Sequence, residues 1–116
     1  MKIRLRGPLA KPAAAAGCLE ESCLNPVAGT STPGQLIQTL KRALGQADAC
    51  LAAKFQARED VNQLVKARAW VVDQLILYAW RSLLPAGENV SLVAVGGFGR
   101  GELHPHSDVD LLILLA

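Results

Sequence analysis

Two adjoining stretches of helical periodicity constrain this sequence most, because together they occupy residues 33 to 84. Apolar residues recur there every three or four positions, which places an apolar stripe along one face of each helix. The first stripe comprises Leu36, Leu40, Leu44, Ala47, Leu51 and Phe55, and the second Val61, Leu64, Val65, Val72, Leu75 and Ile76, with Arg68 among them. The sequence therefore predicts two helices, over about 33–57 and 59–84.

The start of each predicted helix carries a capping signal. Thr32 can cap the first helix, and Pro33 suits its first turn, where a backbone N–H has no helical partner. Asp60 is the expected cap of the second helix, with Gln63 at the third position. Three aromatic residues are expected to pack in the interior: Trp70, Tyr78 and Trp80. Five basic residues are expected on solvated faces: Lys54, Arg58, Lys66, Arg68 and Arg81.

Residues 1–31 show no sustained period and contain Pro8, Pro12 and Pro26, so we expect a flexible leader or irregular cover. The basic start and the run of small residues match a secretion signal poorly, because Pro8, Lys11 and Pro12 interrupt its apolar part. No run approaches the roughly 18 apolar residues of a membrane span, so no membrane association is expected.

Cys18, Cys23 and Cys50 form an odd set without metal-ligand spacing. Reduced thiols in a cytoplasmic protein are the favoured interpretation, and a disulfide or a zinc site is the alternative. The formal net charge of +2 is too small to indicate nucleic-acid binding. Two tryptophans, one tyrosine and two phenylalanines give no evident stacking surface for bases, so no nucleic-acid partner is expected.

The pattern changes from helical to strand-like near the C-terminus. Residues 91–95 (SLVAV) are short and apolar and predict a buried strand, and residues 109–115 (VDLLILL) predict another. Between them lie the glycine segment GGFGRG and the turn HPHS. The sequence therefore predicts an α+β fold in which two N-terminal helices lead into a small sheet.

Asp108 and Asp110 stand at the beginning of the last strand. Residues i and i+2 of a strand point to the same face, so the two carboxylates would project together and repel each other unless a cation lay between them. Hard cations such as Mg²⁺ take oxygen ligands. The pair therefore predicts a Mg²⁺ site.

Four glycines follow the first predicted strand directly: Gly96, Gly97, Gly99 and Gly101. Glycine lets the backbone approach a bound group closely and adopt positive φ, and the amides of such a turn favour an anion such as a triphosphate. The segment is neither a Walker loop nor a dinucleotide-binding fingerprint. A glycine turn ten residues before an Asp-x-Asp pair is the layout that metal-assisted phosphoryl or nucleotidyl transfer requires.

The segment VAVGGFGRGELHPHSDVDLLIL resembles the signature of polymerase-beta-like nucleotidyltransferases. More narrowly, it is similar to the N-terminal part of the uridylyltransferase/uridylyl-removing family that modifies the nitrogen regulator PII, and LVKARAWVVDQLILYAW resembles the helix before the motif there. The resemblance covers about residues 61–115. It implies that residues 32–116 hold the N-terminal part of a nucleotidyltransferase domain, with a truncated sheet of that fold.

The resemblance also implies roles residue by residue. Two glycines match the pair that contacts the triphosphate, two polar residues support phosphate or backbone geometry, and two aspartates match the catalytic, metal-binding carboxylates. The glycines are Gly96 and Gly97, and the supporting polar residues are Arg100 and Ser107. The carboxylates are Asp108 and Asp110. The family transfers UMP from UTP to a tyrosine of PII and releases pyrophosphate, so Mg²⁺, UTP and PII are the expected cofactor and partners, in the cytoplasm. Glu102 is expected to be structural, and His104 and His106 to form the turn.

The sequence stops at Ala116 in an apolar run, whereas the superfamily uses a third carboxylate on a later strand. We therefore expect an N-terminal fragment of the enzyme, inactive by itself. Two alternatives stay open. One is a minimal antitoxin-type nucleotidyltransferase with another acceptor, and the other is a non-catalytic remnant whose two amphipathic helices bind a partner.

Overall fold

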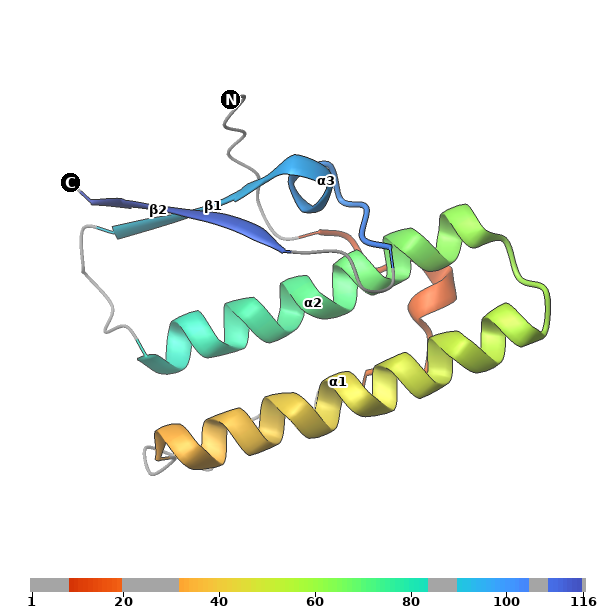
Figure 1. The fold of residues 1–116 in the computed structure, drawn as a ribbon, viewed down its shortest axis with the longest axis horizontal. Coiled ribbons are helices and arrows are strands. Elements are labelled where there is room, and N and C mark those ends of the chain that lie inside the picture. Colours follow the sequence, from red (N-terminus) through yellow and green to blue (C-terminus); the bar gives the residue numbers. More distant parts are fainter. Residues whose placement is uncertain (1–8, 20–31, 84–89, 105–108, 116) are drawn as a thin grey trace.

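The computed structural model describes residues 9–19, 32–83, 90–104 and 109–115. Two long helices, α1 (Pro33–Gln56) and α2 (Val61–Leu83), lie side by side in opposite directions (Figure 1). They are preceded by the 3₁₀ turn η1 (Ala13–Ala15) and followed by β1 (Val90–Val95), α3 (Gly96–Gly99) and β2 (Asp110–Leu115). Within these ranges the protein is mostly helical, with one two-stranded antiparallel sheet. The expected class, two helices leading into a small sheet, is thus supported, and its narrower assignment to a nucleotidyltransferase sheet stays a prediction.

Side-chain caps start both long helices. The Thr32 hydroxyl accepts a hydrogen bond from the Gln35 N–H (3.2 Å), and the Gln35 side chain accepts one from the Thr32 N–H (3.0 Å). These reciprocal bonds satisfy two N–H groups that a helix start leaves without partners. At α2, an Asp60 carboxylate oxygen accepts from the Asn62 N–H (3.0 Å). The capping roles of Thr32 and Asp60 are therefore confirmed.

The facing stripes of α1 and α2 form the main core, in which Leu36, Leu51 and Leu64 are buried. Trp70 is 3% exposed, so its predicted packing role is confirmed. The predicted apolar stripes place Phe55 and Val61 on the buried faces, and this is wrong where the two helices join: Phe55 is 59% exposed and Val61 51%. These two residues flank the connection between the helices, where neither helix continues to cover the other.

Small residues allow three segments to meet in this core. Ala15 of η1, Ala47 of α1 and Ala67 of α2 are each completely buried and belong to one cluster. A methyl side chain lets backbones approach closely, so the cluster brings the N-terminal turn against both helices. We call these three residues the alanine seam.

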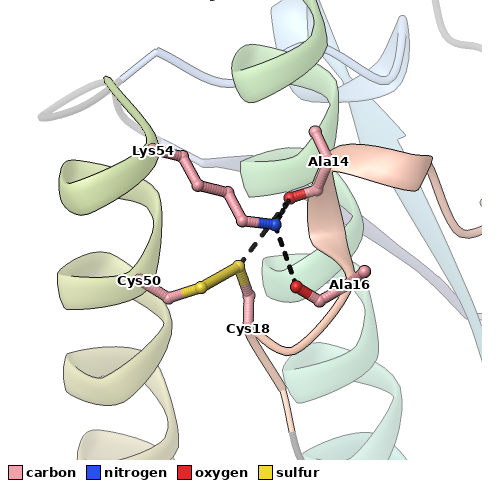
Figure 2. The surroundings of a disulfide bond; sticks show 5 residues. All are labelled: Ala14, Ala16, Cys18, Cys50 and Lys54. Carbon is pink, nitrogen blue, oxygen red and sulfur yellow. Dashed lines mark hydrogen bonds between the residues drawn. A yellow bond between two sulfur atoms is a disulfide. The ribbon is translucent and has the colours of Figure 1, made fainter. Parts of the chain in front are cut away.

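Residues 9–19, which we call the N-terminal strap, lie across α1 and α2 rather than apart from them (Figure 1). Of the segment expected to be a flexible leader or irregular cover, this described part is cover. Cys18 forms a disulfide with Cys50 of α1, 32 positions later (Figure 2). The favoured interpretation of reduced, incidental thiols is therefore wrong for this pair, because folding brings their Cα atoms within 5.4 Å.

Two basic residues predicted on solvated faces have specific partners instead. The Lys54 ammonium donates to the carbonyl oxygens of Ala14 (2.7 Å) and Ala16 (2.9 Å) in the strap. Arg68 forms a salt bridge with Asp48 between α2 and α1, and its side chain is only 18% exposed. Both corrections come from the close packing of α1, α2 and the strap, which periodicity within one helix does not reveal.

None of the helices within the described ranges has the length and apolar character needed to cross a membrane.

Candidate functional site

The glycine segment forms a single helical turn, α3, directly after β1. Gly96 has φ +63° and Gly101 has φ +76°, a region that disfavours side chains. The Glu102 N–H donates to the Gly97 carbonyl (3.0 Å), and the Gly101 N–H to that of Phe98 (3.0 Å), so the turn closes on itself. The chain can then return towards β2.

Asp110 lies beside this turn because of the register of the sheet. It is the first residue of β2 and pairs with Val95, the last residue of β1, so Gly96 follows its pairing partner. A Cβ atom placed on Gly96 would lie 3.1 Å from Asp110 Oδ2. Position 96 therefore favours glycine for two reasons, its positive φ and the neighbouring carboxylate.

The other predicted site residues divide between described and undescribed parts of the chain. Arg100 is exposed, and its guanidinium lies 3.8 Å from where a Gly97 Cβ would be. Ser107 and Asp108 lie outside the described residues, as does His106. The predicted shared face of Asp108 and Asp110 therefore stays a prediction, as do the roles assigned to all six site residues.

The glycine turn is anchored to α2 by a small second core. Phe98 and Leu103 are each 2% exposed and cluster with Ala69 of α2. The Leu103 N–H donates to the Val65 carbonyl of α2 (3.2 Å). This anchoring fixes the position of the turn relative to the helices.

Two residues that lie near the turn, Asp73 and Leu9, were not predicted from the sequence. Asp73 of α2 is 6% exposed, and its Oδ2 accepts a hydrogen bond from the Leu9 N–H in the strap (3.1 Å). The Leu9 side chain lies against the turn, since a Cβ on Gly101 would be 3.3 Å from Leu9 Cδ2. An acidic residue within the apolar run WVVDQLIL was the available signal, because buried carboxylates need partners.

The chemistry of the carboxylates can be compared with the expected Mg²⁺. Within the described ranges no three His, Cys, Asp or Glu residues gather as a metal cluster. Asp110 is exposed and offers oxygen beside a backbone surface that only a glycine leaves open. Mg²⁺ usually binds one or two carboxylates and keeps waters or phosphates as its other ligands, so this donor fits it.

A separate pocket of about 430 Å³ lies between the end of α1 and the start of α2. Phe55 and Val61 line it, which accounts for their exposure, together with the Asp48–Arg68 pair and His104. Its lining includes neither the turn glycines nor Asp110. We place the candidate site at the glycine turn instead, because the sheet register brings Gly96 next to Asp110 there.

Comparison with known proteins supports the same region. A family model described as a nucleotidyltransferase domain matches residues 74–116. Proteins named bifunctional uridylyltransferase/uridylyl-removing enzyme are similar over 80 residues, with 51% identity in Stutzerimonas stutzeri, 48% in Pseudomonas putida strain W619 and 48% in Azotobacter vinelandii. The aligned part is 68% of this chain but 9% of each of these relatives. No solved structure matches. The chain is thus homologous to a fragment of these enzymes and carries part of a nucleotidyltransferase domain.

Proposed function

We propose that this chain, homologous to part of the bifunctional uridylyltransferase/uridylyl-removing enzymes, supplies the nucleotide-binding half of an active site that transfers UMP from UTP to a tyrosine of PII. Pyrophosphate is the product released. The chain spans about a tenth of the length of these relatives. The resemblance to the nucleotidyltransferase superfamily implies a third carboxylate, and we propose that residues beyond the aligned ones supply it. The proposed location is the cytoplasm.

One observation carries the proposal, namely the closeness of Gly96 to Asp110. The 3.1 Å between a Cβ at position 96 and Asp110 Oδ2 means that bare backbone borders the carboxylate. A triphosphate bound along the turn would lie next to that oxygen without an intervening side chain. The geometry therefore supports a site where phosphate and metal ligand meet.

The residues of this chain would divide the work as follows. Gly96 and Gly97 let the triphosphate approach the backbone, and Arg100 adds a positive charge at the exposed side of the turn. Asp110, with Asp108 two positions earlier, would hold Mg²⁺. When bound there, Mg²⁺ neutralises triphosphate charge and favours release of pyrophosphate. Ser107 supports the backbone before the carboxylates.

Nucleotide binding by this chain can be tested apart from catalysis. We expect UTP with Mg²⁺ to shift the backbone NMR signals of Gly96, Gly97 and Asp110 in the 116-residue protein, and Asp110→Asn to remove these shifts while leaving the α1 and α2 signals in place. Absence of any UTP-dependent shift at the glycine turn would contradict the proposed site. It would favour a helical interaction module instead.

The acceptor is tested with the protein made in its source cells. An antibody to residues 34–84 should detect a product several times heavier than 12.3 kDa, and that product should label PII with UMP from α-labelled UTP. Asp108→Asn and Asp110→Asn should each abolish labelling. Labelling of another acceptor, with PII unlabelled, would support the antitoxin-type alternative.

A further inference from the structure

We propose that the Cys18–Cys50 disulfide is a reversible redox site, opened by a dithiol reductant and closed by a small-molecule disulfide, which controls how firmly the N-terminal strap holds the glycine turn. The regulatory part rests on the function proposed above, because it concerns the same turn. The redox chemistry stands independently of that function.

The two cysteine residues differ in burial. Cys18 is 3% exposed and sits in the main core cluster, whereas Cys50 is only half-buried on α1. An incoming thiolate therefore reaches the Cys50 sulfur more readily, and Cys18 becomes the leaving group. Attack on one defined sulfur is a determinant of the rate of thiol–disulfide exchange.

Lys54 is positioned to assist that departure. It lies one helical turn after Cys50, and its hydrogen bonds to the Ala14 and Ala16 carbonyls hold the ammonium beside Cys18 (Figure 2). A neighbouring cation stabilises a thiolate, and a stabilised thiolate leaves faster. Lys54 is thus a positioning and charge-stabilising residue for the exchange.

The exchange balances with a dithiol as reductant. Its thiolate attacks Cys50 Sγ, the bond between the two protein sulfurs breaks, and the electron pair leaves on Cys18 Sγ. The second thiol of the reductant, as thiolate, then attacks the mixed disulfide and releases Cys50. Two electrons and two protons pass from the dithiol to the protein, and a disulfide oxidant takes them back in the reverse reaction.

The other end of the strap contacts the glycine turn. Leu9 donates its N–H to Asp73 Oδ2 (3.1 Å) and packs against Gly101 and the second core. Between the two ends, the Lys11 ammonium lies 5.2 Å from the centre of the Trp70 ring. Opening the disulfide removes the covalent link of the strap to α1 and leaves the Lys54 hydrogen bonds and the burial of Ala15 to hold that end. Since the other end of the strap supports the turn, reduction should loosen the turn. Disulfides of cytoplasmic proteins are usually transient and redox-sensing, which agrees with this use.

The test uses the 116-residue chain with Cys23→Ser, which leaves one cysteine pair. Protein equilibrated in mixtures of reduced and oxidised dithiothreitol is alkylated and weighed intact, and amide hydrogen exchange is followed for peptides covering residues 96–103. We expect a reversible two-electron transition and faster exchange in the reduced form. Lys54→Met should slow reduction several-fold, Lys54→Arg should restore the rate, and Lys66→Met, at an exposed lysine of α2, should leave it unchanged.

Three results would overturn parts of the proposal. Full alkylation of both cysteines under oxidising conditions would show that the pair does not form a redox site. Equal reduction rates for Lys54→Met and Lys66→Met would remove the role of Lys54. Equal exchange at residues 96–103 in both redox states would remove the link to the turn. None of these measurements uses UTP or PII, so failure of UMP transfer would leave them standing.

Discussion

Replacing Gly96 with alanine tests whether this position requires glycine. The native φ of +63° costs an L-residue about 1–2 kcal/mol. The new Cβ would lie 3.1 Å from Asp110 Oδ2, but that exposed carboxylate can move away by a few tenths of an ångström. Most of the cost is therefore in the backbone, and we expect the free energy of unfolding to fall by about 1–2 kcal/mol.

Gly97→Ala is the matched control, one residue along the same turn. Gly97 has no positive φ, and its Cβ would meet the Glu102 carbonyl at 3.4 Å, the edge of ordinary contact. Alanine also has the higher helix propensity, so we expect a change within about 0.5 kcal/mol. Urea unfolding of both variants measures the difference, under oxidising conditions so that the disulfide is constant.

The same pair of variants also reports on Asp110. A Cβ at position 96 displaces the carboxylate, whereas one at position 97 does not touch it. Mn²⁺ affinity, measured by paramagnetic relaxation as a stand-in for Mg²⁺, should therefore weaken in Gly96→Ala and not in Gly97→Ala. Equal unfolding free energies in the two variants would refute the reasoning on φ, and equal Mn²⁺ affinities would refute the reasoning on the carboxylate.

Three further predictions concern stability and are measured by urea unfolding. Reducing Cys18–Cys50, which closes a loop of 32 positions, should lower the unfolding free energy by about 4 kcal/mol in the chain-entropy model, and reductant should have no effect on a Cys18→Ser variant. Thr32→Ala should lower the unfolding free energy by about 1 kcal/mol through loss of the cap of α1, and Thr32→Ser should retain most of the stability that the cap contributes. Arg58→Gly should add about 0.5–1 kcal/mol, because Arg58 has φ +63°, whereas Arg58→Ala should bring no such gain.

The two long helices could be predicted from sequence because their signals are local. Thr32 and Asp60 were predicted to cap the two helices, and each side chain accepts a hydrogen bond from a backbone N–H only two or three residues later. The stripe failed at Phe55 and Val61, since periodicity gives the face of a residue but not where the neighbouring helix stops covering it.

The connections between distant segments could not be predicted in this way. Cys18 and Cys50 have no informative spacing, and only the packing of the strap on α1 brings them together. Lys54 and Arg68 look like ordinary surface cations along their helices, yet each reaches a partner on another segment.

The candidate site could be predicted in part from the sequence. The motif indicated a glycine turn near carboxylates, and the closeness of Gly96 to Asp110 follows from the register of β1 and β2. Asp108 and Ser107 lie outside the described residues, so their part in the site stays a prediction.

The alanine seam limits how this protein can change over generations. Most of the single-nucleotide changes that alter an alanine codon's amino acid introduce valine, threonine, proline, or aspartate or glutamate, and each of these adds bulk, charge or a backbone restriction. At Ala15, Ala47 and Ala67 the side chain has no free surface into which such a residue could expand. Serine and glycine are the substitutions that remain open, so variation at these three positions should be confined to the smallest residues, whatever reaction the protein performs.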